Sequence, residues 1–341
     1  MAGLTPADRL RARMQRRVRQ LSPELGKDVL KAWERLAAGM SVGKMEAVIA
    51  AGGVDALFDE VLNDALLERA FAQVEQRFTQ QAVDNMAFFA KDYGIGFGVL
   101  DPKVIDSIRA LDFNMMKDIK SDVFDVARES VEQGLRNGVN PRTIARGLRR
   151  DIGLTGKQLE WVDNFRNELE TSSKKALRRS LGRGFIRLPD GSVGYNAAHA
   201  GGIGVRKTDM ATLRRVLGTD EKLSPEQVDR MVDAYRRRLT ALHSEAIART
   251  ATLDSLKNAQ HQATDQAIKQ GVLNADRMWS EWVTAGDDRV RDAHVAMAGD
   301  KVPFGTEFKN GQTIPGSSDY MCRCSKRDYL GKYHGQGIPI T

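Results

Sequence analysis

The chain has 341 residues, of which 41% are hydrophobic, 28% charged and only 6% aromatic, and its formal net charge is +7. This length can bury a substantial core in two or more structural regions, and the long tracts rich in Ala, Leu, Glu and Arg favour helix. No apolar run approaches the roughly 18–20 residues of a membrane-spanning helix, which argues against an integral helical membrane protein. The surplus positive charge indicates either an anionic partner, nucleic acid first, or a solvated basic surface.

The N-terminal 20 residues are strongly basic and lack the apolar segment of a secretory signal, so we expect a protein made in a cytoplasm. Asp8 is the only acid among them. The arginines of this block are Arg9, Arg11, Arg13, Arg16, Arg17 and Arg19. The block is either a flexible arm drawn to phosphates or one side of a basic helix, and the sequence supports both alternatives. We treat residues 1–20 as a basic arm and residues 21–110 as a helical partner-binding region.

Helical spacing of apolar residues predicts one amphipathic helix over 54–91, followed by a glycine-rich joint at 93–98. No strand precedes these glycines and no Lys-Ser/Thr follows them, so they are not a phosphate-binding loop. Asp101-Pro102 predicts the start of the next helix, which extends to about Asn137 with a break near 112–114.

The middle of the chain, residues 111–275, is predicted to be a helical body interrupted by one β-hairpin. Further helices are expected over 141–151 and 156–181, and a long helix over 224–271 with a break at Arg249-Thr250. The turn Pro189-Asp190-Gly191 predicts the hairpin at about 184–195. The residues before this turn contain a second basic cluster without an acid: Lys174, Lys175, Arg178, Arg179, Arg183 and Arg187.

Residues 276–335 are predicted to form a small α+β domain. Alternation over 277–284 indicates a strand, and extended pieces are expected around 302–304 and 320–322. A short helix beginning at Asp287 or Asp288 would place His294 on its inward face, at helical spacing from Val290 and Met297. The predicted fold class is therefore mainly α, with long helices, one mid-chain hairpin and short strands near the C-terminus.

The two cysteines, Cys322 and Cys324, lie too close in sequence to form an unstrained disulfide, and together with His294 they are candidate ligands for a zinc ion. A fourth ligand would come from one of four residues: His334, Asp287, Asp288 or Asp319. The alternative is a hydrogen-bonded histidine beside two buried thiols, because Cys-x-Cys is shorter than the usual ligand spacing and free cysteines are commonly buried.

An enzyme is not predicted. A Cys–His pair with Glu281 or Asp319 orienting the imidazole would be the best catalytic arrangement. However, neither cysteine lies at a recognisable helix N-terminus, and the sequence has no Gly-x-Ser-x-Gly, His-Glu-x-x-His or phosphate-loop motif.

Several residues in a fixed order resemble the phage Mu F-type minor head protein domain, a family of head morphogenesis proteins of tailed phages. The signature residues are Trp282, Thr284, Asp287, Val290, Arg291, His294, Gly299, Phe308, Gly311, Pro315, Cys322, Arg323 and Cys324. The upstream segments 152–155, 164–166 and 248–250 are also similar to that family, so the resemblance covers roughly 120–330. Ala251 and Met321 depart from it, because the family usually has Glu and Asn there.

The resemblance implies a non-enzymatic virion component that joins the head near the portal vertex. Its expected partners are the portal protein, the major capsid or other head proteins, and packaged double-stranded DNA, with no membrane during assembly. It implies that His294, Cys322 and Cys324 stabilise the C-terminal domain, with a structural zinc as the candidate cofactor. The expected DNA contacts are Arg11, Arg13, Arg16, Arg17, Lys174, Lys175, Arg178, Arg179 and Arg183. The alternatives are a DNA-binding or DNA-ejection protein of the virion, or a zinc-dependent or Cys/His enzyme.

Overall fold

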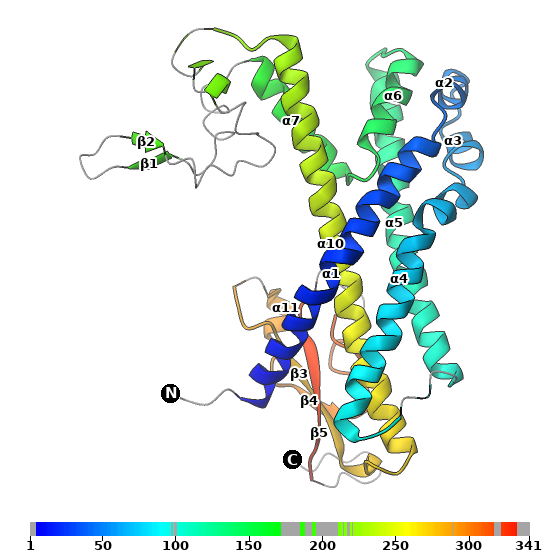
Figure 1. Ribbon diagram of the computed structural model, residues 1–341, viewed down its shortest axis with the longest axis vertical. Coiled ribbons are helices and arrows are strands. Elements are labelled where there is room, and N and C mark those ends of the chain that lie inside the picture. The colour runs from blue at the N-terminus through cyan, green and yellow to red at the C-terminus, as the bar shows by residue number, and fades with distance from the viewer. Residues whose placement is uncertain are drawn as a thin grey trace. The chain divides into compact units, whose positions relative to one another are not determined.

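The protein is mainly helical, with a small antiparallel sheet near its C-terminus, as the sequence predicts (Figure 1). The computed structural model describes residues 5–96, 98, 101–171, 185–187, 193–195, 211–213, 215–216, 219, 221–288, 290–316 and 322–332. The α-helices are α1 (Pro6–Gly39), α2 (Val42–Ala50), α3 (Val54–Glu60), α4 (Asp64–Ala90), α5 (Pro102–Arg136), α6 (Pro141–Asp151), α7 (Gly156–Glu170), α10 (Pro225–Lys269) and α11 (Asp292–Val295). Short 3-10 helices are η1 (Lys91–Tyr93) and η4 (Ala275–Arg277). None of the described helices is both long and apolar enough to cross a membrane.

The chain divides into two compact units, and four long helices contribute residues to both. The first unit contains residues 1–29, 71–117 and 245–341, and the second contains 30–70 and 118–244. Each unit has a hydrophobic core of its own.

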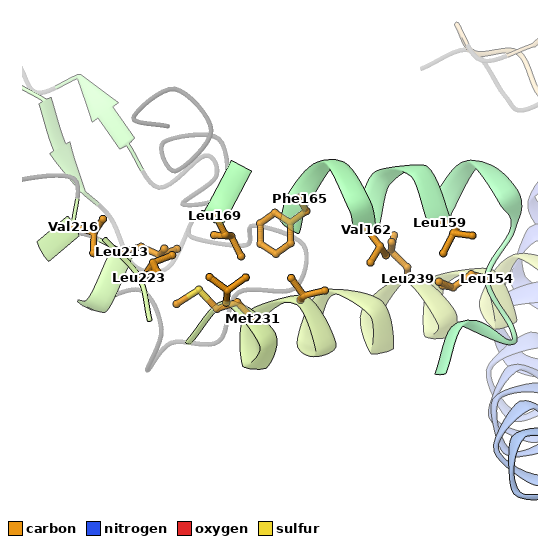
Figure 2. Packing of buried hydrophobic residues seen from close by; sticks show 12 residues of the cluster. Leu154, Leu159, Val162, Phe165, Leu169, Leu213, Val216, Leu223, Met231 and Leu239 are labelled. Atoms are coloured by element: carbon orange, nitrogen blue, oxygen red, sulfur yellow. The ribbon is translucent and has the colours of Figure 1, made fainter. Parts of the chain in front are cut away.

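In the second unit, α7 packs along the N-terminal half of α10. Leu159, Val162 and Leu169 of α7 point toward α10, whose Met231 and Leu239 face them (Figure 2). Thr155 begins α7 with a reciprocal capping box, in which its hydroxyl accepts from the Gln158 amide and the Gln158 side chain accepts from the Thr155 amide. The cap fixes the start of the helix and therefore the register of this apolar face.

In the first unit, the C-terminal half of α10 packs against the beginning of α1 and the end of α4. Leu256, Ala259 and Ala263 of α10 share one buried cluster with Met14 of α1 and Met86 of α4. The small residues of α10 let the neighbouring helices approach closely, which is why this stretch is rich in alanine.

The three-stranded sheet of the first unit has the order β4-β3-β5, and both pairings are antiparallel. The central strand β3 (Met278–Val283) pairs with β4 (Lys301–Pro303) and with β5 (Ser325–Leu330). Nearly every residue of β3 is buried, so this strand is covered on both faces and does not show the expected alternation of buried and exposed positions.

Several predicted boundaries are wrong. The helix expected over 54–91 is interrupted, because Asn63 accepts a hydrogen bond from the Leu66 amide and starts α4 anew. The breaks expected at 112–114 and 249–250 do not occur. In α5 the buried residues on either side, Ile108 and Met115, hold one continuous helix against the weak local propensity.

Two predictions in the C-terminal region are also corrected. Of the strand expected at 320–322, residues 320 and 321 lie outside the described part of the chain and Cys322 is not in a strand, while the observed strand is Ser325–Leu330. The short helix begins at Asp292 with Arg291 in the capping position, so neither Asp287 nor Asp288 caps it.

The expected helix 156–181 ends at Glu170, and residues 172–181 lie outside the described part of the chain.

The two remaining local predictions have clear outcomes. The hairpin is present as β1 (Phe185–Arg187) paired antiparallel with β2 (Val193–Tyr195). At the N-terminus, residues from Pro6 onward belong to α1, so the helical alternative is the one observed for the basic block.

Candidate metal centre

The structure brings His294, Cys322 and Cys324 together, as predicted. The Nδ1 atom of His294 lies 3.4 Å from the Sγ of Cys322 and 3.6 Å from the Sγ of Cys324. The three candidate ligand atoms all lie within 4.8 Å of one another, and all three residues are buried. Zn²⁺ binds cysteine sulfur at about 2.3 Å and histidine nitrogen at about 2.0–2.1 Å, so one ion fits between atoms at this spacing. The group could therefore hold a metal ion such as zinc.

Local structure brings the histidine to the two cysteines. His294 lies in α11, whose first turn follows the end of β3, and its ring meets the edge of the Trp282 indole at a centroid distance of 5.4 Å. Gly299, with φ 79°, reverses the chain after α11 and donates its amide hydrogen to the Trp282 carbonyl at 2.9 Å. An L side chain rarely adopts such a backbone conformation, so this turn favours glycine.

A small apolar cluster encloses the sulfur atoms. Trp282 packs against Phe308 with perpendicular rings and a centroid distance of 5.2 Å, and Met297 lies in the same cluster. Gly316, with φ 73°, passes so close to Cys322 that a Cβ atom there would collide with the thiol. The approach of the 316 backbone therefore requires glycine and closes the site on that side.

Buried positive charge stabilises a thiolate at this site. The Nζ of Lys257, a residue only 1% exposed, donates to the Cys322 carbonyl at 3.0 Å and is paired with Asp254, also at 3.0 Å. A hydrogen bond from Cys324 and the charge of Lys257 lower the pKa of the Cys322 thiol to about 5, although its burial acts in the opposite direction. The hydrogen bond to Cys322 and burial raise the pKa of Cys324. The two pKa shifts therefore favour the thiolate at Cys322 and the thiol at Cys324.

The other residues proposed for this site have different roles. Asp287, a candidate fourth ligand, accepts two hydrogen bonds from the Arg323 guanidinium, at 2.5 and 2.7 Å. Glu281, proposed to orient the imidazole, is paired instead with Arg327 across the strands. Asp288 is exposed. His334 and Asp319 lie outside the described residues.

The space beside the three ligands is small. A cavity of about 20 Å³ is lined by Ala285, Val290, Arg291, His294, Cys322, Arg323 and Cys324. A water molecule needs roughly 10–15 Å³ by this measure, whereas pockets for small molecules begin at about 300 Å³. The space beside the three ligands can hold a fourth ligand as small as a water molecule, and it does not accommodate an organic substrate.

The predicted nucleic-acid contacts are only partly described. Lys174, Lys175, Arg178, Arg179 and Arg183 all lie outside the described residues. Of the N-terminal set, Arg13 forms two hydrogen bonds to Asp92, at 2.5 and 3.0 Å, and Arg17 donates to Asn85 at 3.2 Å. Arg11 donates to the Thr284 carbonyl at 3.0 Å, while Arg16 is exposed. Three of the four N-terminal arginines therefore hold contacts within the first unit.

Sequence reasoning did not identify Lys257 as part of the site. It lies 65 residues from Cys322 along the chain. The one local signal for Lys257 is its place on the face of α10 where helical spacing requires a buried residue. That face can be recognised only once both ends of the helix are known.

The fold and the site define a helical protein whose C-terminal α+β region closes around a candidate Cys₂His metal centre. Comparison of the chain with protein-family models, with curated proteins and with solved structures gives no match.

Proposed function

We propose that this protein is a non-enzymatic minor head protein of a tailed phage. In this proposal it joins the head beside the portal vertex after synthesis in the host cytoplasm, bridges portal and capsid proteins, and contacts packaged double-stranded DNA. The supporting observation is that several of the C-terminal residues carrying the resemblance to the Mu F-type domain contact one another in one small region.

Several of these signature residues contact each other directly, through hydrogen bonds or ring packing. Arg323 donates to Asp287 through its two terminal guanidinium nitrogens, Trp282 packs on His294, and Gly299 donates to the Trp282 carbonyl. A bidentate arginine–carboxylate pair is among the stronger polar contacts available to a protein. These contacts support a role in holding the C-terminal region together, and the cavity beside the ligands is too small for an organic substrate.

The finer proposal for the metal is a structural zinc bound by His294 Nδ1 and by the sulfur atoms of Cys322 and Cys324. Zinc bound in this way would contribute folding free energy, because its ligands are assembled only in the folded chain. Two thiolates neutralise the charge of the ion, and the Lys257 ammonium near the Cys322 carbonyl supports the deprotonated state that the ion requires.

Co-purification with the portal tests the head-protein function. We expect the protein to co-purify with a tagged portal protein when the two are co-expressed. Trp282→Ala should abolish co-purification because it opens the cluster around the ligands, whereas Trp161→Ala, at a tryptophan 43% exposed on α7, should preserve it. A wild-type chain missing from the purified portal complex would remove the main support for this function.

Metal analysis tests the zinc proposal separately. The purified wild type should contain about one zinc per chain, and Cys322→Ser should lose both the metal and several degrees of thermal stability. Met297→Leu is the matched control, since Met297 lies in the same buried cluster but offers no comparable ligand. Equal metal content in wild type and Cys322→Ser would exclude this site, and any zinc-dependent turnover lost with the metal would favour the enzyme alternative.

A further inference from the structure

Helix α6 (Pro141–Asp151) has one buried apolar face and a basic face that the other described residues leave largely unneutralised. Ile144, Ala145 and Leu148 are buried. Arg142, Arg146, Arg149 and Arg150 are all exposed. No acid accompanies them on the exposed side, because Asp151, the only acid of the helix, is 7% exposed and paired with Arg236.

From this arrangement we propose that the basic face of α6, formed by these four arginines, is a docking surface for the phosphate backbone of double-stranded DNA. The inference rests on the DNA contact included in the proposed function, and it places that contact in the second unit, on residues that sequence reasoning did not select.

Arg142 lies where a helix does not favour positive charge. It follows the capping residue Asn140 and Pro141, so it occupies the first turn, and that turn has no acidic residue. The unpaired amides at a helix N-terminus carry partial positive charge, and a cation there costs up to about 1 kcal/mol at an exposed position. Arg149 and Arg150 lie in the last turn, where they stabilise the helix dipole and need no further explanation. Arg142 and Arg146 are therefore the residues that point to an external anion.

The spacing of the arginines adds a second local cost. Arg142, Arg146 and Arg150 follow one another at four-residue intervals, so they form one row on the helix, and like charges at this spacing repel. The Nε of Arg142 lies 3.9 Å from a carboxylate oxygen of Glu46, and the Arg142 side chain remains 59% exposed. Arg149 donates to the Ala37 carbonyl, which gives it a fixed position but no neutralising charge. Among the described residues, no carboxylate lies within ion-pair distance of Arg146 or Arg150.

The row is suited to phosphates. Four residues of helix advance about 6 Å, so three guanidinium groups are presented over about 12 Å of a rigid helix. The sequence of α6 contains no aromatic residue on which an unpaired base could stack. Contact with the backbone of a duplex, independent of base sequence, is therefore the mode that these side chains support.

Binding of the full-length protein to a fluorescent duplex of about 30 base pairs, measured by anisotropy over a series of salt concentrations, tests the proposal. The logarithm of the binding constant falls with the logarithm of salt concentration by about 0.9 for each phosphate neutralised. Arg142→Gln combined with Arg146→Gln should therefore make the slope shallower by about 1.8 and weaken binding on duplexes of any sequence. The thermal unfolding temperature of this variant should equal or slightly exceed that of the wild type, because the substitutions remove exposed, mutually repelling charges.

The matched control is Arg237→Gln combined with Arg238→Gln, which removes the same charge from exposed positions of α10 in the same unit. This control should leave the slope within about 0.3 of the wild-type value. Equal slope changes in both variants, or none in the α6 variant, would overturn the assignment. Undiminished DNA binding by the α6 variant together with lost binding to anionic lipid vesicles would also overturn it, in favour of a membrane surface. Portal co-purification is scored independently, so failure of this inference leaves the head-protein test intact.

Discussion

The two ends of helix α10 are buried by different means. Near its start, Met231, Val232 and Leu239 pack against α7 in an apolar core. Further along, the same helix buries a run of polar side chains, all at most 7% exposed: Thr252, Ser255, Lys257, Asn258, Gln260, Thr264 and Gln266. One helix therefore has a largely apolar interface in the second unit and, in the first, an interface that adds buried polar side chains to an apolar cluster. Most of these polar side chains are hydrogen-bonded, but the Oγ1 of Thr252 and the Oε1 of Gln260 have no partner among the described residues.

The polar end is specified by individual partners. Ser255 accepts from Asn85 of α4 at 3.1 Å, and Thr264 donates to Asp328 of β5 at 3.2 Å. A buried polar group without a partner costs about 1–3 kcal/mol, so each of these contacts favours a single arrangement of neighbours. At the apolar end, the side-chain volume of a substitution should determine how much stability is lost. At the polar end, the loss should depend on whether each buried polar atom keeps its hydrogen-bond partner.

Removing the carboxylate of Asp328 is expected to have the largest effect. Its side chain is 0% exposed, lies 3.1 Å from the Nζ of Lys326 and accepts from Ser280 at 2.7 Å. Asp328→Ala leaves the Lys326 ammonium buried without its counter-charge, which should lower the free energy of unfolding by about 3–5 kcal/mol. Urea unfolding of the variant beside Asp276→Ala, at an exposed acid of the same region, measures the effect. A loss below about 1 kcal/mol would show that the polar end is as tolerant as a surface.

At the apolar end, size rather than chemistry should determine the cost. Leu169 is fully buried against α10. Leu169→Ala should lower the free energy of unfolding by about 2–5 kcal/mol because it leaves a cavity, while Leu169→Met should cost less than about 1.5 kcal/mol. Leu135→Ala, at a leucine 40% exposed on α5, is the surface control and should change it by at most about 0.5 kcal/mol. A methionine variant as unstable as the alanine variant would contradict the comparison.

The same contrast explains what the sequence could predict. The long helices and the apolar face of α7 follow from periodic spacing, which depends only on neighbours in the chain. The breaks expected in α5 and α10 were wrong because tertiary burial of Ile108 and Met115, or of the α10 residues around Thr252, outweighs weak local propensity. The interruption before α4 depends on one side-chain cap by Asn63, which the apolar pattern conceals.

For the site, the ligand set was predictable and its surroundings were not. Soft ligands are few in this chain, so His294, Cys322 and Cys324 could be singled out by residue type alone. The strand β5 was misplaced because its sequence, SKRDYL, is mostly polar and shows no alternation of apolar residues, and its burial decreases from Ser325 to the exposed Leu330. Lys257 and the pairing of Asp287 with Arg323 depend on contacts between residues 36 or more positions apart, for which local spacing carries no signal.

The smallest of the expected effects concerns His261 at the polar end of α10. Its Nδ1 accepts from the Lys326 ammonium at 2.9 Å, and its ring stacks on Phe304 with a centroid distance of 4.8 Å. Burial and the adjacent Lys326 charge lower the pKa of His261 from 6.5 to about 3, and burial also lowers the pKa of Lys326. Asp328, the carboxylate of this group, is already engaged by Lys326, so it does not stabilise a second cation.

Acidification should therefore weaken this end of α10 before the carboxylates titrate. Below pH 6.5 His261 is protonated in the unfolded chain, whereas in the folded chain it stays neutral down to about pH 3. The contribution of the neutral His261 to stability is therefore complete above pH 6.5 and declines as the pH falls. The decline approaches about 1.4 kcal/mol per pH unit within that window. His261→Gln keeps an acceptor for Lys326 but has no titrating group, so between pH 7 and pH 5.5 its urea midpoint should fall less than that of the wild type. Parallel pH profiles for the two proteins would show that His261 is solvated in the folded chain. They would also show that the polar end of α10 is less completely buried than its contacts indicate.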